Sequence, residues 1–314
     1  MSTTQPFYVL ESARCQLVLD CRGDAPALLH WGDRLGDATS PEMLAVLATR
    51  QEAQARPAVE APLSLSPTAG AGFTGRPGLE VHRENGRWAV YARIDEVVAE
   101  ADNALTVRST CSATRLRIVH RLALDVDSDV LRASTEIENA GDSPLRVVTC
   151  SAPCIPVPLH YDRIIGFEGR WAHEFQQHRT QRHAGLYLRE NRAGRTSHDT
   201  FPGLVLHTAN ADEAQGAAYA LHLGWSGNHR LAVEELSDGR CCAQFGELLL
   251  PGEVCLAPGE RYRSPELFGV HTNAGLSAAS RCLHHFVRAR LTDVRVKGKL
   301  KPVHFNTWEA AYFD

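Results

Sequence analysis

The fold is decided by residues 116–149, LRIVHRLALDVDSDVLRASTEIENAGDSPLRVVT, near the middle of the chain. Apolar residues recur at alternate positions, for example at Leu122, Leu124 and Val126, and polar clusters at 127–129 and 139–142 interrupt the alternation. A period of two with one apolar face is typical of half-buried antiparallel strands, and clusters of Asn, Gly and Asp favour tight turns. The stretch therefore predicts successive strands joined by short turns.

The same alternation begins upstream, at Arg87. Trp88, Val90, Ala92 and Ile94 share one predicted face of a strand. Closely spaced strands with no helical pattern between them favour a sandwich over a parallel α/β sheet. The predicted fold class is therefore mainly β, with antiparallel sheets.

Two stretches have helical patterns. Ser40 can cap a helix, and Pro41 and Glu42 suit its first turn. A second helix is predicted after Gly275, where apolar residues fall on one helical face: Leu276, Leu283, Phe286, Val287 and Leu291. The Ala-, Pro-, Ser- and Gly-rich stretch 48–71 predicts a loop or an extended crossing.

Composition excludes several classes of protein. The 314 residues carry 33 Lys and Arg against 37 Asp and Glu, a net charge of −4, which argues against a nucleic-acid partner. Membrane spans need about 18 apolar residues in a row, and the chain has no such run. The N-terminus has no basic segment followed by an apolar stretch, so no secretory signal and no membrane partner are predicted.

The nine cysteines are scattered, odd in number and without a CxxC pair. This pattern favours reduced thiols in a cytoplasmic protein, most of them packed in the core, over a metal site.

The residue pattern of the chain changes after the second predicted helix. Residues 294–301 are predicted to form a basic connector. Residues 303–308, VHFNTW, predict a new buried strand, and the given sequence ends six residues later, at Asp314. The predicted boundaries are a sandwich over 1–274, a helical and basic linker over 275–301, and the start of a further domain over 302–314.

Several polar-aromatic strings recur along the chain. In order they are LLHWG (28–32), GFTGRPG (72–78), RWAHEF (170–175), GRTSH (194–198), LHLGWSGN (221–228), LAPGERYRSPE (256–266) and PVHFNTWEAAYFD (302–314). Their order and spacing resemble the N-terminal half of glycoside hydrolase family 36, the large bacterial α-galactosidases. The match runs from about residue 28 to the last residue, and its most specific parts are WSGN, PGE…SPE and the closing string.

The resemblance implies an N-terminal β-supersandwich, a helical connector, a (β/α)8 barrel and a small C-terminal β domain. It also implies retaining hydrolysis of terminal α-1,6-galactosides such as melibiose and raffinose. In the family two barrel aspartates carry out this chemistry, the nucleophile within a Lys-x-Asp-x-Asn-like string, and no such string occurs in this chain. The resemblance therefore assigns to this chain the sandwich, the linker and the first strand of a truncated barrel. It implies no catalytic residue in the chain and no cofactor or metal, so the isolated chain is expected to be inactive.

Four residues are expected near the sugar. Trp308, Glu309 and Asp314 lie at the end of the implied barrel strand, the edge where barrel active sites form. Trp308 could form an apolar wall or pack between barrel and sandwich, while Glu309 and Asp314 are expected to orient rather than catalyse.

Arg76 is the fourth of these residues. In the family the supersandwich forms the oligomer and contributes loops to a neighbouring subunit's active site, and a Phe/Arg/Pro string lies in that region. The sequence departs from the commonest form, because Gly75 lies between Thr74 and Arg76 and no Asp precedes Phe73. A role for Arg76 in packing its own loop stays open.

Other interpretations remain open. Residues 225–228 predict a tight turn at which Gly227 permits a positive φ. A metal site at 170–174 is conceivable, but an inter-domain hydrogen-bond network is favoured there. On the second helix, one ring of His284 and His285 is expected to pack. From another class of protein, a stand-alone carbohydrate-binding or scaffold module is the alternative to the hydrolase, and within the family N-acetylgalactosaminides or galactosyl transfer are possible.

Overall fold

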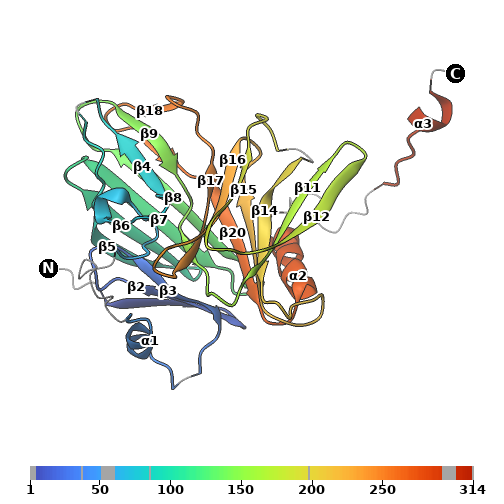
Figure 1. The fold of residues 1–314 in the computed structure, drawn as a ribbon, viewed down its shortest axis with the longest axis horizontal. Coiled ribbons are helices and arrows are strands. Elements are labelled where there is room, and N and C mark those ends of the chain that lie inside the picture. Colours follow the sequence, from blue (N-terminus) through green and yellow to red (C-terminus); the bar gives the residue numbers. More distant parts are fainter. Residues whose placement is uncertain are drawn as a thin grey trace.

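The computed structural model describes residues 5–36, 38–50, 61–84, 86–196, 199–291 and 302–312, and most of them lie in antiparallel strands (Figure 1). The largest sheet has ten strands. Their order is β12-β11-β14-β15-β20-β8-β7-β6-β5, with β19 paired to β8. The bounds are β5 Arg93–Glu100, β6 Ala104–Cys111, β7 Leu116–Leu124, β8 Leu131–Asn139, β11 Arg163–Arg170, β12 His173–Gln181, β14 Thr200–His207, β15 Ala218–Gly224, β19 Arg261–Arg263 and β20 Glu266–Thr272.

Three smaller sheets accompany the large one. Their strand orders are β1-β2-β3, β10-β17-β16-β13 and β18-β9-β4. The bounds are β1 Phe7–Glu11, β2 Cys15–Asp20, β3 Ala27–Asp33, β4 Leu79–His82, β9 Leu145–Cys150, β10 Ile155–Pro156, β13 Gly185–Asn191, β16 His229–Glu235, β17 Cys241–Glu247 and β18 Val254–Leu256. The helical segments are α1 Pro41–Leu47, a 3-10 turn Ala69–Ala71, α2 Leu276–Phe286, a π-helical turn Val287–Leu291 and α3 Trp308–Ala311.

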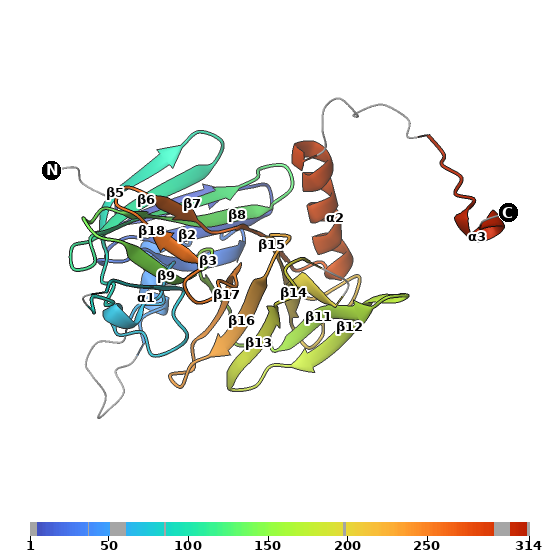
Figure 2. The same ribbon diagram turned by 90° about the horizontal axis from the view of Figure 1, so that it is seen from above.

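The two faces of the large sheet bury different layers. Tyr219 and Leu221 belong to the main core, together with β1–β3 and the four-stranded sheet. Ala220 lies between them in β15 and packs instead in a cluster with Phe286 of α2. Because successive residues of a strand point to opposite faces, α2 covers the face of the sheet opposite the main core (Figure 2).

The structure confirms the predicted fold class of mainly β, antiparallel sheets. The strands β7, β8 and β9 fall within 116–150 and turn at the two predicted polar clusters. The Ser40 side chain accepts a hydrogen bond from the Met43 N–H at 3.3 Å, and Pro41 opens α1 as predicted. All nine cysteines are free, and eight of them are buried, Cys255 being exposed. In the described parts of the chain, no helix is long and apolar enough to cross a membrane.

The strand predicted from Arg87 is wrong over its first half. Pairing of β5 with β6 begins at Arg93, and the chain before it crosses the 3-10 turn as coil, with Trp88 57% exposed. A Cβ on Gly70 would lie 2.4 Å from the Val90 carbonyl oxygen, so this turn holds the Val90 backbone at close range. A tertiary contact therefore replaces the strand that the alternation predicts.

The buried strand predicted over 303–308 does not form. Residues 302–307 have no regular structure, Trp308 begins the short helix α3, and Val303 is 98% exposed and Phe305 83% exposed. A strand requires a hydrogen-bonded neighbour, and none of the described residues pairs with this segment. The assignment of 302–314 as the start of a barrel therefore stays a prediction.

The second predicted helix is confirmed, but its packing differs from the prediction. The buried residues of α2 are small ones and Phe286, while Val287 is 46% exposed. His284 and His285 are both exposed, so neither ring packs. The side chain of Leu291 lies outside the described structure.

Candidate functional site

The Arg76 loop, residues 72–78, follows the 3-10 turn. Gly72 ends that turn with a left-handed φ of 84°, a conformation that favours glycine. Phe73 then enters a buried cluster with Cys154, Leu236 and Cys242. The loop is therefore anchored at its start by an aromatic side chain.

Side chains of β16 and β17 clamp the loop by its backbone. The Glu234 carboxylate accepts a hydrogen bond from the Arg76 N–H at 2.7 Å, and the Gln244 amide donates to the Arg76 carbonyl at 2.7 Å. A Cβ on Gly75 would lie 2.4 Å from Leu236 Cδ2 and 2.8 Å from Glu234 Oε2. Glycine at 75 therefore permits the loop to lie directly on the sheet.

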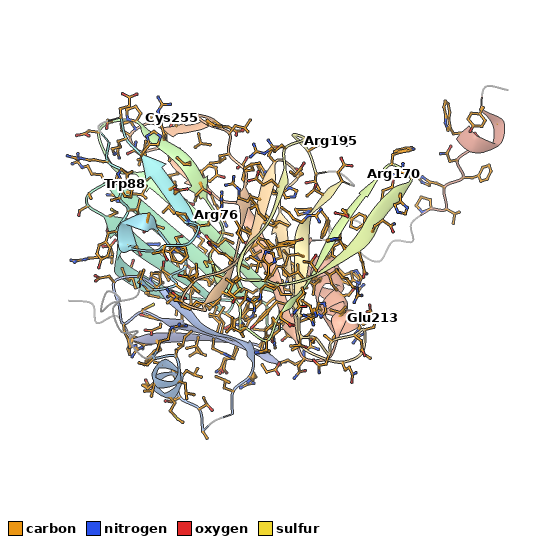
Figure 3. All side chains as sticks on the ribbon, in the orientation of Figure 1. Arg76, Trp88, Arg170, Arg195, Glu213 and Cys255 are labelled. Atoms are coloured by element: carbon orange, nitrogen blue, oxygen red, sulfur yellow. The ribbon has the colours of Figure 1, made fainter. Side chains whose placement is uncertain are left out.

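The guanidinium of Arg76 takes no part in this anchoring. The side chain, labelled in Figure 3, is half-buried and forms no ion pair with a described carboxylate, while the nearby Glu190 is paired with Arg230. Burial lowers the pKa of Arg76, and the neighbouring charge of Arg230 lowers it further, whereas Glu190, Glu80 and Glu234 raise it. The loop thus presents a cation that has no partner in the described chain.

An ordered charge network lies beside Arg76. Glu190 on β13 accepts hydrogen bonds from Arg230 Nε at 2.6 Å and from Arg192 Nη2 at 2.7 Å. Burial raises the pKa of Glu190, but the bonds from Arg192 and Arg230 outweigh it and lower the pKa. Because Glu190 is already engaged by two arginines, Arg76 remains available for an external acceptor.

The structure brings two of the sequence strings together above β13 and β16. The Asn228 side chain accepts from the Gly194 N–H at 2.8 Å, and Asn191 donates to the carbonyls of Arg195 and Gly227. Loop 192–196 and turn 225–228 thus form one unit, with Arg195 at the upper edge of the molecule (Figure 3). The predicted tight turn is confirmed.

The positive φ predicted at Gly227 was wrong. Gly227 has no positive φ, but a Cβ there would lie 2.8 Å from Trp225 Nε1. Contact with the indole, rather than backbone handedness, requires glycine at this position.

Of the three C-terminal site residues, Trp308 is the one whose side chain the structure describes. Trp308 lies in α3, 53% exposed, with its ring 6.1 Å from that of Tyr312. Glu309 belongs to the same helix, but its side chain lies outside the described structure, as does all of Asp314. α3 is drawn apart from the sheets in Figure 1. Substrate roles for Trp308, Glu309 and Asp314 stay predictions.

The hairpin of β11 and β12 carries the RWAHEF string at its tip. Trp171 is 82% exposed, and the Phe175 ring lies tilted against those of Phe167 and Phe201, with centroids 6.3 and 5.3 Å away. The side chain of Glu174 accepts from the Ala172 N–H at 2.9 Å. Across the described ranges, no cluster of three metal-ligating side chains occurs.

Sequence reasoning missed the partners that shape this site. Glu234 and Gln244 lie more than 150 positions beyond Arg76, and neither belongs to a quoted string. The density of glycines at 72, 75 and 78 was the available signal, because a backbone that lies directly on a neighbour requires glycine. Glu190 and Arg230 carry no comparable signal.

Comparison with known proteins gives two consecutive family matches. Residues 24–257 match the Glycosyl hydrolase family 36 N-terminal domain, and residues 261–314 match Melibiase. A curated alpha-galactosidase of Escherichia coli is 36% identical over 307 residues, which cover 97% of this chain and 42% of that protein. Alpha-galactosidase AgaA of Geobacillus stearothermophilus is 30% identical over 186 residues, 59% of this chain and 26% of that protein. The chain thus spans less than half the length of these relatives.

Solved structures agree on the fold. A variant of AgaA from Geobacillus stearothermophilus in complex with raffinose superposes with a TM-score of 0.88 at 23% identity, over 98% of this chain and 46% of that one. The alpha-galactosidase from Lactobacillus brevis gives 0.88 at 21% identity, over 98% and 45%. The antiparallel sandwich is therefore the fold of the N-terminal part of these enzymes.

Proposed function

Because the chain belongs to glycoside hydrolase family 36, we propose that it is the N-terminal part of a retaining α-galactosidase that hydrolyses terminal α-1,6-galactosides of the melibiose and raffinose type. The match of 97% of this chain to 42% of the Escherichia coli alpha-galactosidase carries the proposal. Retaining hydrolysis needs two carboxylates about 5–5.5 Å apart, one as nucleophile and one as acid and base. Neither is assigned in this chain, so the chain alone is inactive.

The first role of the chain in the complete enzyme is to support the catalytic barrel. An apolar groove of about 590 Å³ lies between α2 and the large sheet. Its lining includes Phe167, Phe201, Phe268 and Phe286. Exposed apolar surface of this kind marks an interaction site. The barrel that follows the linker is the proposed occupant.

The second role is to complete the sugar pocket. Arg76 is half-buried on a clamped loop, with no ion-pair partner in the described chain, and a guanidinium donates hydrogen bonds to sugar hydroxyl oxygens. In a homo-oligomer built through the supersandwich, Arg76 reaches the substrate of a neighbouring subunit, and Trp308, Glu309 and Asp314 border the pocket. The buried free thiols fit a reducing compartment, so we place the enzyme in the cytoplasm.

A chimera tests this proposal. Residues 1–314 are joined to the remainder of the Escherichia coli alpha-galactosidase, and hydrolysis of an aryl α-galactoside is measured for the chimera and for the isolated chain. The chimera is expected to hydrolyse the substrate, and the isolated chain is expected to match a mock purification. Turnover by the isolated chain would overturn the assigned inactivity, and a folded chimera without activity would count against the assignment to an α-galactosidase.

Substitution of Arg76 in the chimera separates binding from packing. Loss of one charge-assisted hydrogen bond costs about 1.5–3 kcal/mol, so Arg76→Ala is expected to raise KM roughly tenfold or more. Arg192→Ala, on the neighbouring exposed network, is the control and should leave KM within about twofold of the parent. An unchanged KM for Arg76→Ala would leave this residue with a packing role alone.

A further inference from the structure

A second cavity, separate from the Arg76 loop, lies against the inner face of β6 and β7. Its volume is about 220 Å³. Ser109, Ile118 and His120 line it from the two strands, and Ser66 lines it from the segment before the 3-10 turn. Loops 23–26 and 90–92 surround its mouth. None of the proposed catalytic or substrate roles uses this cavity.

Hydroxyl and imidazole groups gather in this cavity. Ser66 Oγ lies 2.8 Å from His120 Nε2. His120 is 2% exposed and Ser109 is 3% exposed, yet His120 Nδ1 and Ser109 Oγ have no hydrogen-bond partner among the described residues. If Ser66 donates to Nε2, Nδ1 carries an unpaired N–H; if Nε2 donates to Ser66, Nδ1 is an unpaired acceptor. Either tautomer of His120 therefore leaves a polar group for a further partner.

Unpaired buried polar groups are costly. Each costs about 1–3 kcal/mol, and buried polar atoms of native proteins are normally hydrogen-bonded to protein, water or ligand. The volume corresponds to about seven water molecules at the density of the liquid. The cavity is thus much larger than a single bridging water requires, and its apolar lining by Ile118 and Val90 suits carbon as well as hydroxyl groups.

Charge excludes ionic ligands. The described residues that line the cavity include no lysine or arginine, so an anion would find no counter-charge among them. The carboxylate of Asp24 at the mouth already accepts from the Tyr91 hydroxyl at 2.6 Å and lies 3.5 Å from Arg93 Nε. Burial lowers the pKa of His120 to about 4, so the imidazole is neutral at pH 7. The lining therefore matches a neutral molecule with several hydroxyl groups.

We propose that this cavity binds a small neutral polyhydroxy molecule, no larger than a monosaccharide, through Ser66, Ser109 and His120. The Asp24–Tyr91 hydrogen bond joins two of the segments that line the cavity. The site binds rather than catalyses, because no carboxylate of the described residues orients His120 for attack by Ser66. The inference goes beyond the proposed α-galactosidase role and does not depend on it.

Ligand-observed NMR on the 314-residue chain tests the site, with glycerol and D-galactose as probes. Saturation transfer to at least one probe is expected, with a saturable dependence on probe concentration. Loss of one neutral hydrogen bond weakens binding about three- to tenfold, which is the effect expected for Ser109→Ala and for Ser66→Ala. Tyr91→Phe removes the hydrogen bond between Tyr91 and Asp24 and is expected to speed exchange of the bound probe.

Thr114→Val is the matched control. Thr114 is fully buried and its hydroxyl also has no partner, but it does not line this cavity, so probe binding should be unchanged. Circular dichroism verifies that each variant is folded. Absence of saturable binding for both probes would overturn the proposal, as would binding that neither serine substitution weakens. Because the chain is expected to have no α-galactosidase activity, either result is independent of the chimera experiment.

Discussion

Replacement of Arg83 by methionine should strongly destabilise the fold, because this arginine is buried and bonded to neutral groups. Arg83 is 4% exposed. Its guanidinium donates to the Thr114 carbonyl at 3.0 and 3.1 Å, to the Asn139 side chain at 2.6 Å, and to the Ser143 carbonyl. One side chain thus joins the turn before β7 to the turn after β8. The second turn contains Gly141, at which a Cβ would lie 2.4 Å from Arg83 Nη2.

The magnitude follows from the acceptors that lose their donor. Methionine retains the aliphatic stem but leaves the Thr114 carbonyl unpaired, while Asn139 Oδ1 keeps its bond from the Gly141 N–H and the Ser143 carbonyl keeps its bond from the Asn139 amide. An unpaired buried acceptor costs about 1–3 kcal/mol, and loss of each charge-assisted hydrogen bond costs about 1.5–3 kcal/mol. Removal of a desolvated charge offsets part of this, since burial already lowers the pKa of Arg83. We expect a net loss of about 3–5 kcal/mol, a large fraction of the 5–15 kcal/mol that is typical of whole domains.

Urea denaturation followed by circular dichroism measures this loss, and calorimetry should show a melting temperature lower by about 6–15 °C. Arg115→Met is the matched control. Arg115 lies in the same turn and bonds Asp142 at 2.9 Å, but the two side chains are 52% and 84% exposed, so the change should cost less than about 1 kcal/mol. If Arg83→Met and Arg115→Met have equal free energies of unfolding, the account of Arg83 is wrong.

Three further predictions, with four substitutions, test the site, a buried histidine and the core. Arg76→Ala should alter the free energy of unfolding by less than about 1 kcal/mol, because backbone bonds hold its loop, whereas Phe73→Ala should cost about 3–5 kcal/mol in the same urea titration. The pKa of His120 falls from 6.5 to about 4 on burial, so at acidic pH the unfolded chain binds more protons than the folded one. The free energy of unfolding therefore decreases as the pH drops below 6.5. Between pH 7.5 and 5.0, His120 accounts for about 2 kcal/mol of this decrease, which His120→Gln should remove. Gly269→Ala places a Cβ 2.5 Å from Trp31 Cη2 and should cost about 1–3 kcal/mol by calorimetry, and an unchanged melting temperature would contradict this packing.

Local signals in the sequence predicted the elements that local physics determines. Ser40 and Pro41 fix the start of α1 through a capping bond three residues long, and the cluster at 139–142 turns the chain wherever its flanking strands pair. The strand predicted around Trp88 was wrong because a contact between distant segments, and not local physics, determines this stretch. Its alternation suits a strand, but the close approach of Gly70 to Val90 takes that segment out of the sheet. Contacts between distant segments override a two-residue period, and one sequence without an alignment does not show them.

In the candidate site, too, local features could be predicted from the sequence and contacts between distant segments could not. The string around Arg76 identified the loop, because its glycines are local, whereas the clamps Glu234 and Gln244 arrive from strands far along the chain. The strand expected over 303–308 stays a prediction, because a strand requires a paired neighbour and no described residue pairs with this segment. Residues such as Trp308 thus keep their expected roles only as proposals.

Glycine at position 75 is consistent with a binding role for the Arg76 side chain. A residue larger than glycine at 75 would meet Leu236 and Glu234, which would lift the loop from the sheet and break the bond from the Arg76 N–H. Glycine there brings the backbone down onto β16, where Glu234 and Gln244 fix it on both sides of the Arg76 peptide. All of this fixation acts through the backbone, so the guanidinium is positioned without being paired. An arginine whose role was to hold the loop would be expected to bond the loop with its side chain, as Arg83 bonds its own turns.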